Sequence, residues 1–190
     1  MIENIRQRLE ILKAVISEPE TAKRLSTVSA FAVIAEYKNR IFVDGQTTDG
    51  SPIGQYSNNP FYQNPNTLTG VAASGVTPVG KYGNTTFKNG KPHKTRYLSN
   101  GYSELRTLTG RQNSTVDLNF SGSLERSIKV VQDGETAVIR YTSDSESAKM
   151  TQNERRFGVD ISTVSDDERE IGSDAAAEEI RFILDEIDNS

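Results

Sequence analysis

The chain has 190 residues, of which 34% are hydrophobic and 25% are charged, and its formal net charge at pH 7 is −4. This length fits one domain of ordinary size, or a small core that carries one large loop, and no apolar run approaches the roughly 18 residues that a membrane span needs. Cysteine is absent and His93 is the only histidine, which excludes disulfide scaffolds, thiolate nucleophiles and multi-histidine metal sites. The first ten residues carry charges and no apolar signal core, so we expect synthesis in the cytoplasm.

The first predicted element is a helix with one apolar stripe. Its apolar residues recur at steps of three and four positions, as on one face of an α-helix; they are Ile2, Ile5, Leu9, Leu12 and Ile16. A break follows at residues 17–20. There Ser17 is a suitable N-cap with Glu20 as its capping-box partner, and Pro19 is tolerated in a first turn.

A second helix is expected from about residue 18 to residue 42. Its predicted inward positions are Ala22, Leu25, Val28, Ala32 and Ala35. The middle of this helix, residues 30–35, is apolar nearly all round. It therefore needs cover on more than one side, from a sheet or from a neighbouring subunit.

The sequence changes character between Asp44 and Gly101. This window of 58 residues contains nine of the 14 glycines and five of the six prolines, and no amphipathic period persists in it. Loops of such length are usually functional or disordered. We interpret residues 44–101 as a long excursion from a single domain that spans residues 1–190. Within it, Thr85–Lys88 followed by Asn89-Gly90 indicates a short hairpin.

Regular structure is predicted again after Gly101. A short helix over residues 102–108 ends at Gly110, and residues 116–120 alternate with period two, as in a half-buried strand. The segments 124–131 and 135–141 flank Asp133-Gly134, a strong signal for a hairpin turn.

The last part of the chain is predicted to be one helix. Ser165–Glu168 has the pattern of a capping box, and an apolar stripe follows at Ile171, Ala175, Ile180, Ile183, Leu184 and Ile187. The acids at its start offset the helix dipole, so we expect them to be solvated and not to hold a metal; they are Asp166, Asp167, Glu168 and Glu170. Helices in 1–43, the excursion 44–101, and a small antiparallel sheet with a C-terminal helix in 102–190 predict an α+β fold.

Charge is distributed unevenly along the chain. Residues 1–100 have a net charge of +5 and residues 101–190 a net charge of −9. One window contains five basic side chains and no acid; this basic cluster comprises Lys81, Lys88, Lys91, Lys94 and Arg96. A basic loop on an acidic body favours head-to-tail self-association, and it is equally compatible with a role in solubility alone. The interleaved aromatic residues Tyr82, Phe87 and Tyr97 also suit contact with nucleic acid.

Two fragments resemble catalytic motifs only in part. Gly75–Lys81 has the spacing of a phosphate-binding loop, but Tyr82 and Gly83 follow where a hydroxyl residue and a helix are needed. His93 lies among basic residues, and no nucleophile elbow accompanies it. We therefore expect no catalytic residue, no cofactor and no metal site, and we predict that the protein is not an enzyme.

Three blocks of the sequence carry a resemblance to a known family. The first is Arg40–Gly45 with Asp49–Ser57, the second is Ser121–Ile128, and the third is Arg155–Gly158 with Ser165–Glu168. In this order the blocks resemble segments of the virion-morphogenesis (tail-completion) proteins of Mu-type tailed bacteriophages. In the second block the signature that leads into a hairpin is matched at Ser121, Gly122, Leu124, Ser127 and Ile128.

The resemblance implies a structural virion protein at the head-to-tail joint. Such a protein is made in the host bacterial cytoplasm and forms a homo-oligomeric ring around the DNA channel, in contact with portal, connector or tail tube proteins and transiently with packaged DNA. The chain departs from the family pattern at Ile53, where tryptophan is usual, and at Ser121, where threonine is usual. Another connector or tail ring protein, an assembly factor, and an accessory nucleic-acid-binding protein therefore stay open as alternatives.

Overall fold

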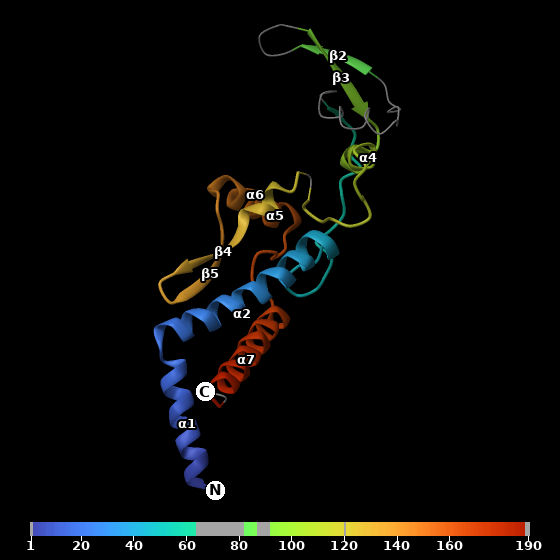
Figure 1. Cartoon of the computed structure of the whole chain (residues 1–190). Helices are drawn as coiled ribbons and strands as arrows, with labels where there is room; N and C mark the ends of the chain where they lie inside the picture. The colour runs from blue at the N-terminus through green and yellow to red at the C-terminus, as the bar shows by residue number, and fades with distance from the viewer. Residues whose placement is uncertain (1, 64–81, 87–91, 120, 189–190) are drawn as a thin grey trace. The chain divides into compact units, whose positions relative to one another are not determined.

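The computed structural model describes residues 2–63, 82–86, 92–119 and 121–188. These residues form helices and two small antiparallel sheets, which confirms the α+β fold with helices near both ends (Figure 1). The chain divides into two compact units. The helical unit comprises Met1–Ser51 and Asp117–Ser190, and the insert unit comprises Pro52–Val116. That the whole chain forms a single domain stays a prediction.

The helical unit begins with α1 (Ile2–Ile16) and α2 (Pro19–Asn39). The predicted Ser17 cap is wrong, because Glu18 occupies the N-cap position of α2 and Pro19 begins the helix. The backbone N–H of Ser17 still bonds to the Lys13 carbonyl, as in a last helical turn. Its hydroxyl donates to the same carbonyl at 2.7 Å, a local bond that competes with capping.

The far end of α2 passes into a π-helical turn, η1 (Arg40–Asp44). Gly45 ends this turn with φ 65°, a left-handed conformation that favours glycine. The inward face of α2 differs from the prediction, because Ala35 is exposed and Ala32 only half-buried. The buried positions are Ala30, Val33, Ile34 and Tyr37. Because residues 30–35 are apolar on nearly all sides, the sequence alone does not indicate which of them face the core.

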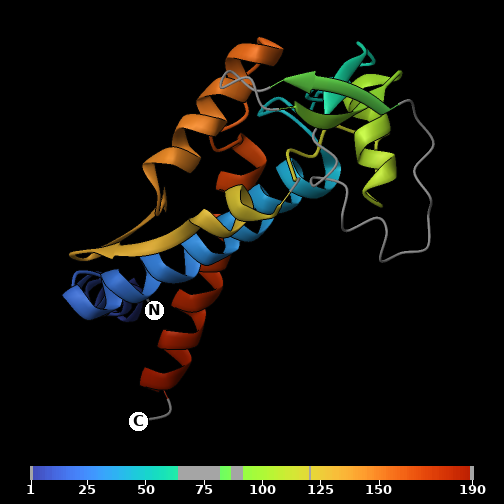
Figure 2. The same cartoon turned by 90° about the horizontal axis from the view of Figure 1, so that it is seen from above.

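The apolar middle of α2 is covered on two sides, as the sequence predicts. The hairpin of β4 (Ile128–Asp133) and β5 (Thr136–Tyr141) packs on one side, and α7 (Asp166–Asp188) packs on another (Figures 1 and 2). α7 runs antiparallel to α2, since Arg24 pairs with Glu179 and Arg40 with Glu168. The sequence predicted cover of this helix by a sheet or by a neighbouring subunit, and the β4–β5 sheet is one such cover.

The predicted hairpin is confirmed, with its turn shifted by one residue. Asp133 pairs with Thr136 in the ladder, and Gly134 in the turn has φ 62°. The first arm is shorter than predicted, because residues 123–127 form the helical turn α5 (Ser123–Ser127). The strand predicted over 116–120 is absent at the described residues 116–119. There Leu118 has φ 49°, and the Asp117 carboxylate accepts a bond from the Asn119 N–H.

Besides the short α5, one helix of the helical unit was not predicted from the sequence. This helix is α6 (Asp144–Phe157), and Met150 is its single buried residue. Because almost every position faces solvent or is only partly covered, α6 has no apolar stripe from which a helical period can be recognised. Gly158 ends it with φ 70°.

The insert unit is more regular than the loop that the sequence predicted. β1 (Phe61–Gln63), β3 (Pro92–Leu98) and β2 (Tyr82–Thr86) form an antiparallel sheet in the order β1-β3-β2, followed by α4 (Gly101–Leu108). The pairing of β2 with β3 agrees with the predicted hairpin, whose Asn89-Gly90 turn lies outside the described residues. The predicted short helix is confirmed by α4. Its Arg106 is 1% exposed and lies over the Tyr56 ring at 4.5 Å.

Candidate functional site

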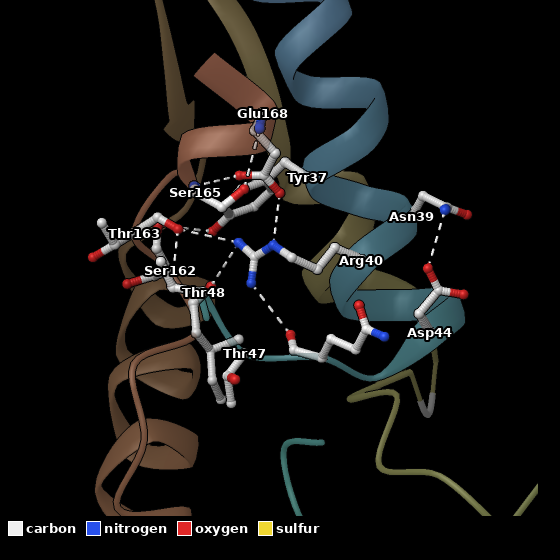
Figure 3. Close-up of polar contacts among 12 residues, drawn as sticks. Tyr37, Asn39, Arg40, Asp44, Thr47, Thr48, Ser162, Thr163, Ser165 and Glu168 are labelled. Carbon is white, nitrogen blue, oxygen red and sulfur yellow. Dashed lines mark hydrogen bonds and ion pairs between the residues drawn. The ribbon is translucent and has the colours of Figure 1, made fainter. Parts of the chain in front are cut away.

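The most completely built polar site in the described part of the helical unit joins η1 to the start of α7 (Figure 3). Arg40 Nε donates to Glu168 Oε1 at 2.6 Å, and the two side chains are 7% and 0% exposed. A buried ion pair of this kind needs further hydrogen bonds, because both charges have lost their hydration.

The other polar atoms of this pair have partners from two loops, the one after η1 and the one before α7. The Arg40 Nη atoms donate to the carbonyl oxygens of Gln46, Ile161 and Thr163 at 3.1–3.2 Å. Glu168 Oε2 accepts from the Ser165 N–H at 2.8 Å, and Ser165 Oγ accepts from the Glu168 N–H at 3.2 Å. The predicted capping box is therefore confirmed, and Glu168 serves both the cap and the ion pair. We call this arrangement the Arg40–Glu168 clamp.

Tyr37 closes the clamp from α2. Its ring lies 5.3 Å from the Arg40 guanidinium carbon, and its hydroxyl donates to the Ser162 carbonyl at 3.2 Å. The Tyr141 hydroxyl oxygen of β5 lies 3.4 Å from the Tyr37 hydroxyl oxygen. Burial raises the pKa of Tyr37 and of Tyr141 above the ordinary tyrosine value, because it disfavours the charged phenolate.

The segment that follows Gly45 forms a tight hydrogen-bonded turn beside the clamp. Thr47 Oγ1 donates to Asp49 Oδ1 at 2.5 Å, and the Ser51 N–H donates to the same oxygen at 3.1 Å. These bonds, that from Thr47 first, lower the pKa of Asp49. Thr48 ties the turn to the loop before α7, because its N–H donates to the Asp160 carbonyl and its hydroxyl to the Thr163 carbonyl, both at 3.0 Å.

Two adjoining pockets of about 650 and 480 Å³ open beside this turn. Most of the residues that line them are serine, threonine, aspartate or glutamate, and the two pockets share Thr48, Asp49, Ser165 and Asp166. Within the described ranges, no group of three or more His, Asp or Glu side chains is placed to hold a metal ion. The geometry supports a structural role, because the clamp fixes the 45–51 turn and the start of α7 against α2.

The basic cluster falls largely outside the described residues. Lys81, Lys88 and Lys91 lie there, as does the segment 75–81 that resembles part of a phosphate-binding loop. Lys94 and Arg96 are on β3, opposite Asn84 and Tyr82 of β2. His93 is on the same strand, opposite Thr85.

The signature positions that carry the family resemblance build the entry to the β4–β5 hairpin. Gly122 has φ 71° at the start of α5, and Ser127 Oγ donates to the Leu124 carbonyl at 2.7 Å. Leu124 and Ile128 are buried. Ser121 accepts a bond at its carbonyl from Arg126 Nη2 at 2.9 Å. These residues have a local structural role in the helical unit.

The clamp corrects one expectation and adds one residue that sequence reasoning missed. Asp166, Asp167 and Glu170 are exposed as expected, whereas Glu168 is buried against Arg40. The capping-box pattern identifies Glu168, but nothing local indicates Arg40, which lies 128 residues earlier.

Comparison with known proteins found no matching family model, no matching curated protein and no matching solved structure. Among the helices that the structure describes, none combines the length and the apolar character that crossing a membrane requires.

Proposed function

We propose that this chain is a structural virion protein of a tailed bacteriophage, a subunit of a homo-oligomeric ring at the head-to-tail joint around the DNA channel. The proposal rests on the ordered resemblance to tail-completion proteins and on one observation, the division of charge between the two units. It places the finished protein in the virion, with portal, connector or tail tube proteins as neighbours. It involves no catalysis and no cofactor.

The charge of the chain follows its division into units. The insert unit carries seven basic and one acidic side chain, a net charge of +6, whereas the helical unit carries 15 basic and 25 acidic side chains, a net charge of −10. Each copy therefore has one positive and one negative part. Such a subunit suits heterologous contacts, which form a ring when their rotation closes, and the positive part suits the DNA backbone.

The mechanism of such a ring is geometric. The Arg40–Glu168 clamp holds the elements of the helical unit in one arrangement, so that the subunit presents fixed surfaces to its neighbours. The ring joins or caps the next ring, and the basic cluster contacts a neighbour or passing DNA.

The first experiment is quantitative peptide mass spectrometry on purified particles of the source virus, with the portal subunit as reference. We expect a low, fixed copy number comparable to that of the portal ring. Hundreds of copies would indicate a tube or capsid protein, and absence from the particle would favour an assembly factor; either result contradicts the proposal.

A second candidate function, nucleic-acid binding as an accessory protein, is favoured by an aromatic pair in the basic insert unit. Tyr62 of β1 and Tyr97 of β3 pair across the strands with ring centroids 5.1 Å apart, and Tyr62 is 58% exposed. Exposed aromatic rings in a basic surrounding stack on unpaired bases.

This candidate is tested with the full chain and labelled single-stranded DNA. It predicts that the logarithm of the affinity falls linearly with the logarithm of the salt concentration, and that Tyr62→Ala weakens binding. Tyr56→Ala is a poor control because Tyr56 contacts buried Arg106, so Phe31→Ala on the exposed side of α2 is used instead.

A further inference from the structure

α1 carries an apolar seam that is exposed at Leu9 and half-buried at Leu12 and Ile16. Leu9 is 50% exposed, and Ile11 beside it is 43% exposed. The seam comprises Ile2, Ile5, Leu9, Leu12 and Ile16, with strictly alternating steps of three and four residues. This 3.5-residue repeat is that of a helix that pairs with another helix along a narrow line.

The charges beside the seam are incompatible with pairing of α1 to a second α1. Arg6 and Lys13 occupy one flank of the seam and Arg8 the other, so the flanking charges are all basic. In a parallel pair Arg8 faces the partner's Lys13, and in an antiparallel pair equivalent flanks face each other. Both arrangements bring like charges together. The seam therefore fits a helix with acidic flanks.

α7 presents such a face. It contains ten acidic and two basic residues over Asp166–Asp188. Ile171 and Phe182 are 39% and 54% exposed, and they lie on one side because 11 residues make about three turns. Asp174 and Glu178 are exposed between them on the same side. We call these four residues the acidic face. It extends about 17 Å along α7, and the seam extends about 21 Å along α1, so the two lengths are comparable.

We propose that the apolar seam of α1 in one copy docks on the acidic face of α7 in a second copy, head to tail. The occupant is a second copy because Leu9 and Phe182 are both exposed in the same chain, so the chain does not cover one with the other. The contact joins two different surfaces, the seam of one copy and the acidic face of another. Each copy carries both surfaces, so the same contact repeats from copy to copy. Closure into a ring rests on the proposed function, whereas the pairing itself does not.

The test uses sedimentation velocity of the full chain at low ionic strength, over a range of micromolar concentrations. The wild-type chain self-associates. The variants R6E/R8E and D174K/E178K each weaken self-association by more than about tenfold, because like charges then face each other across the contact. The control K129E/R155E makes the same change in net charge as R6E/R8E, at two exposed residues outside α1 and α7, and it associates as the wild type does.

Mixing the two variants distinguishes contact between copies from contact within one chain. In an equimolar mixture every α1 finds a complementary α7 on the other variant, so association returns to the wild-type level. A further chain carries all four substitutions, R6E/R8E/D174K/E178K. If this chain associates as the wild type does while the mixture does not, α1 docks on its own α7 and the proposal is wrong. It is also overturned if the wild-type chain stays monomeric, or if the control variant loses association as well. These measurements use the isolated chain, so they test the pairing of α1 with α7 even if the protein is absent from virions.

Discussion

Among single residues, Asp49 shows how a short turn changes the chemistry of an exposed carboxylate. Its pKa lies below the ordinary value of 3.8, chiefly because the Thr47 hydroxyl donates to it. We predict that Thr47→Val raises the pKa of Asp49 toward the ordinary value, measured by carboxyl ¹³C NMR titration. Thr48→Val is the control, since that hydroxyl donates to the Thr163 carbonyl instead. An equal rise in both variants would exclude Thr47 as the cause.

The buried Arg40–Glu168 ion pair leads to a prediction about the stability of the fold. Glu168→Gln leaves the Arg40 guanidinium buried without its counter-charge, which costs about 3–5 kcal/mol of unfolding free energy. Urea denaturation followed by circular dichroism measures this loss. The matched control is Glu170→Gln, an exposed acid in the same helical turn, for which we expect a change within about 0.5 kcal/mol. Similar losses in the two variants would show that the clamp does not stabilise the fold.

At the scale of secondary-structure elements, the contact between α2 and α7 depends on the absence of a side chain at Gly172. A Cβ there would lie 2.6 Å from Val33 Cγ2 and 2.8 Å from Ser29 Oγ. We therefore predict that Gly172→Ala destabilises the protein by about 1–3 kcal/mol, although alanine favours a helix over glycine. Ser173→Ala, at the exposed neighbouring position, should be neutral or slightly stabilising. Thermal unfolding of both variants checks this, and a stabilised Gly172→Ala would contradict the close packing.

Elements were predictable from the sequence where a period or a cap marks them. α1, α4, the β4–β5 hairpin and the capped start of α7 each carry such a local signal. α6 has one buried residue and therefore no stripe, and β1 of the insert unit is three residues long and lies far along the chain from its partner β3. The candidate site was only half predictable. The cap of α7 identifies Glu168, but its partner Arg40 is brought to it by the antiparallel packing of two helices that are far apart in the chain.

For the molecule as a whole, the paired hydroxyls of Tyr37 and Tyr141 predict sensitivity to alkaline pH. Their pKa values are raised in the folded state, so their contribution to stability is complete below the unfolded value of 10.0 and is lost as pH rises above it. Above that value, each group adds up to about 1.4 kcal/mol per pH unit to the decline in the free energy of unfolding. Urea midpoints measured between pH 8 and pH 11 should fall less steeply above pH 10 in Tyr37→Phe than in the wild-type chain. Parallel declines would contradict the prediction.

The helical unit is discontinuous in the chain, and this has a consequence for its synthesis. The apolar middle of α2 is made early, but its two covers begin only at Ile128 and at Asp166. At roughly 5–20 residues per second, this segment stays uncovered on the ribosome for on the order of ten seconds. During that time it is a binding site for chaperones and for other nascent chains. Translation speed and chaperone supply thus become part of how this protein reaches its folded state.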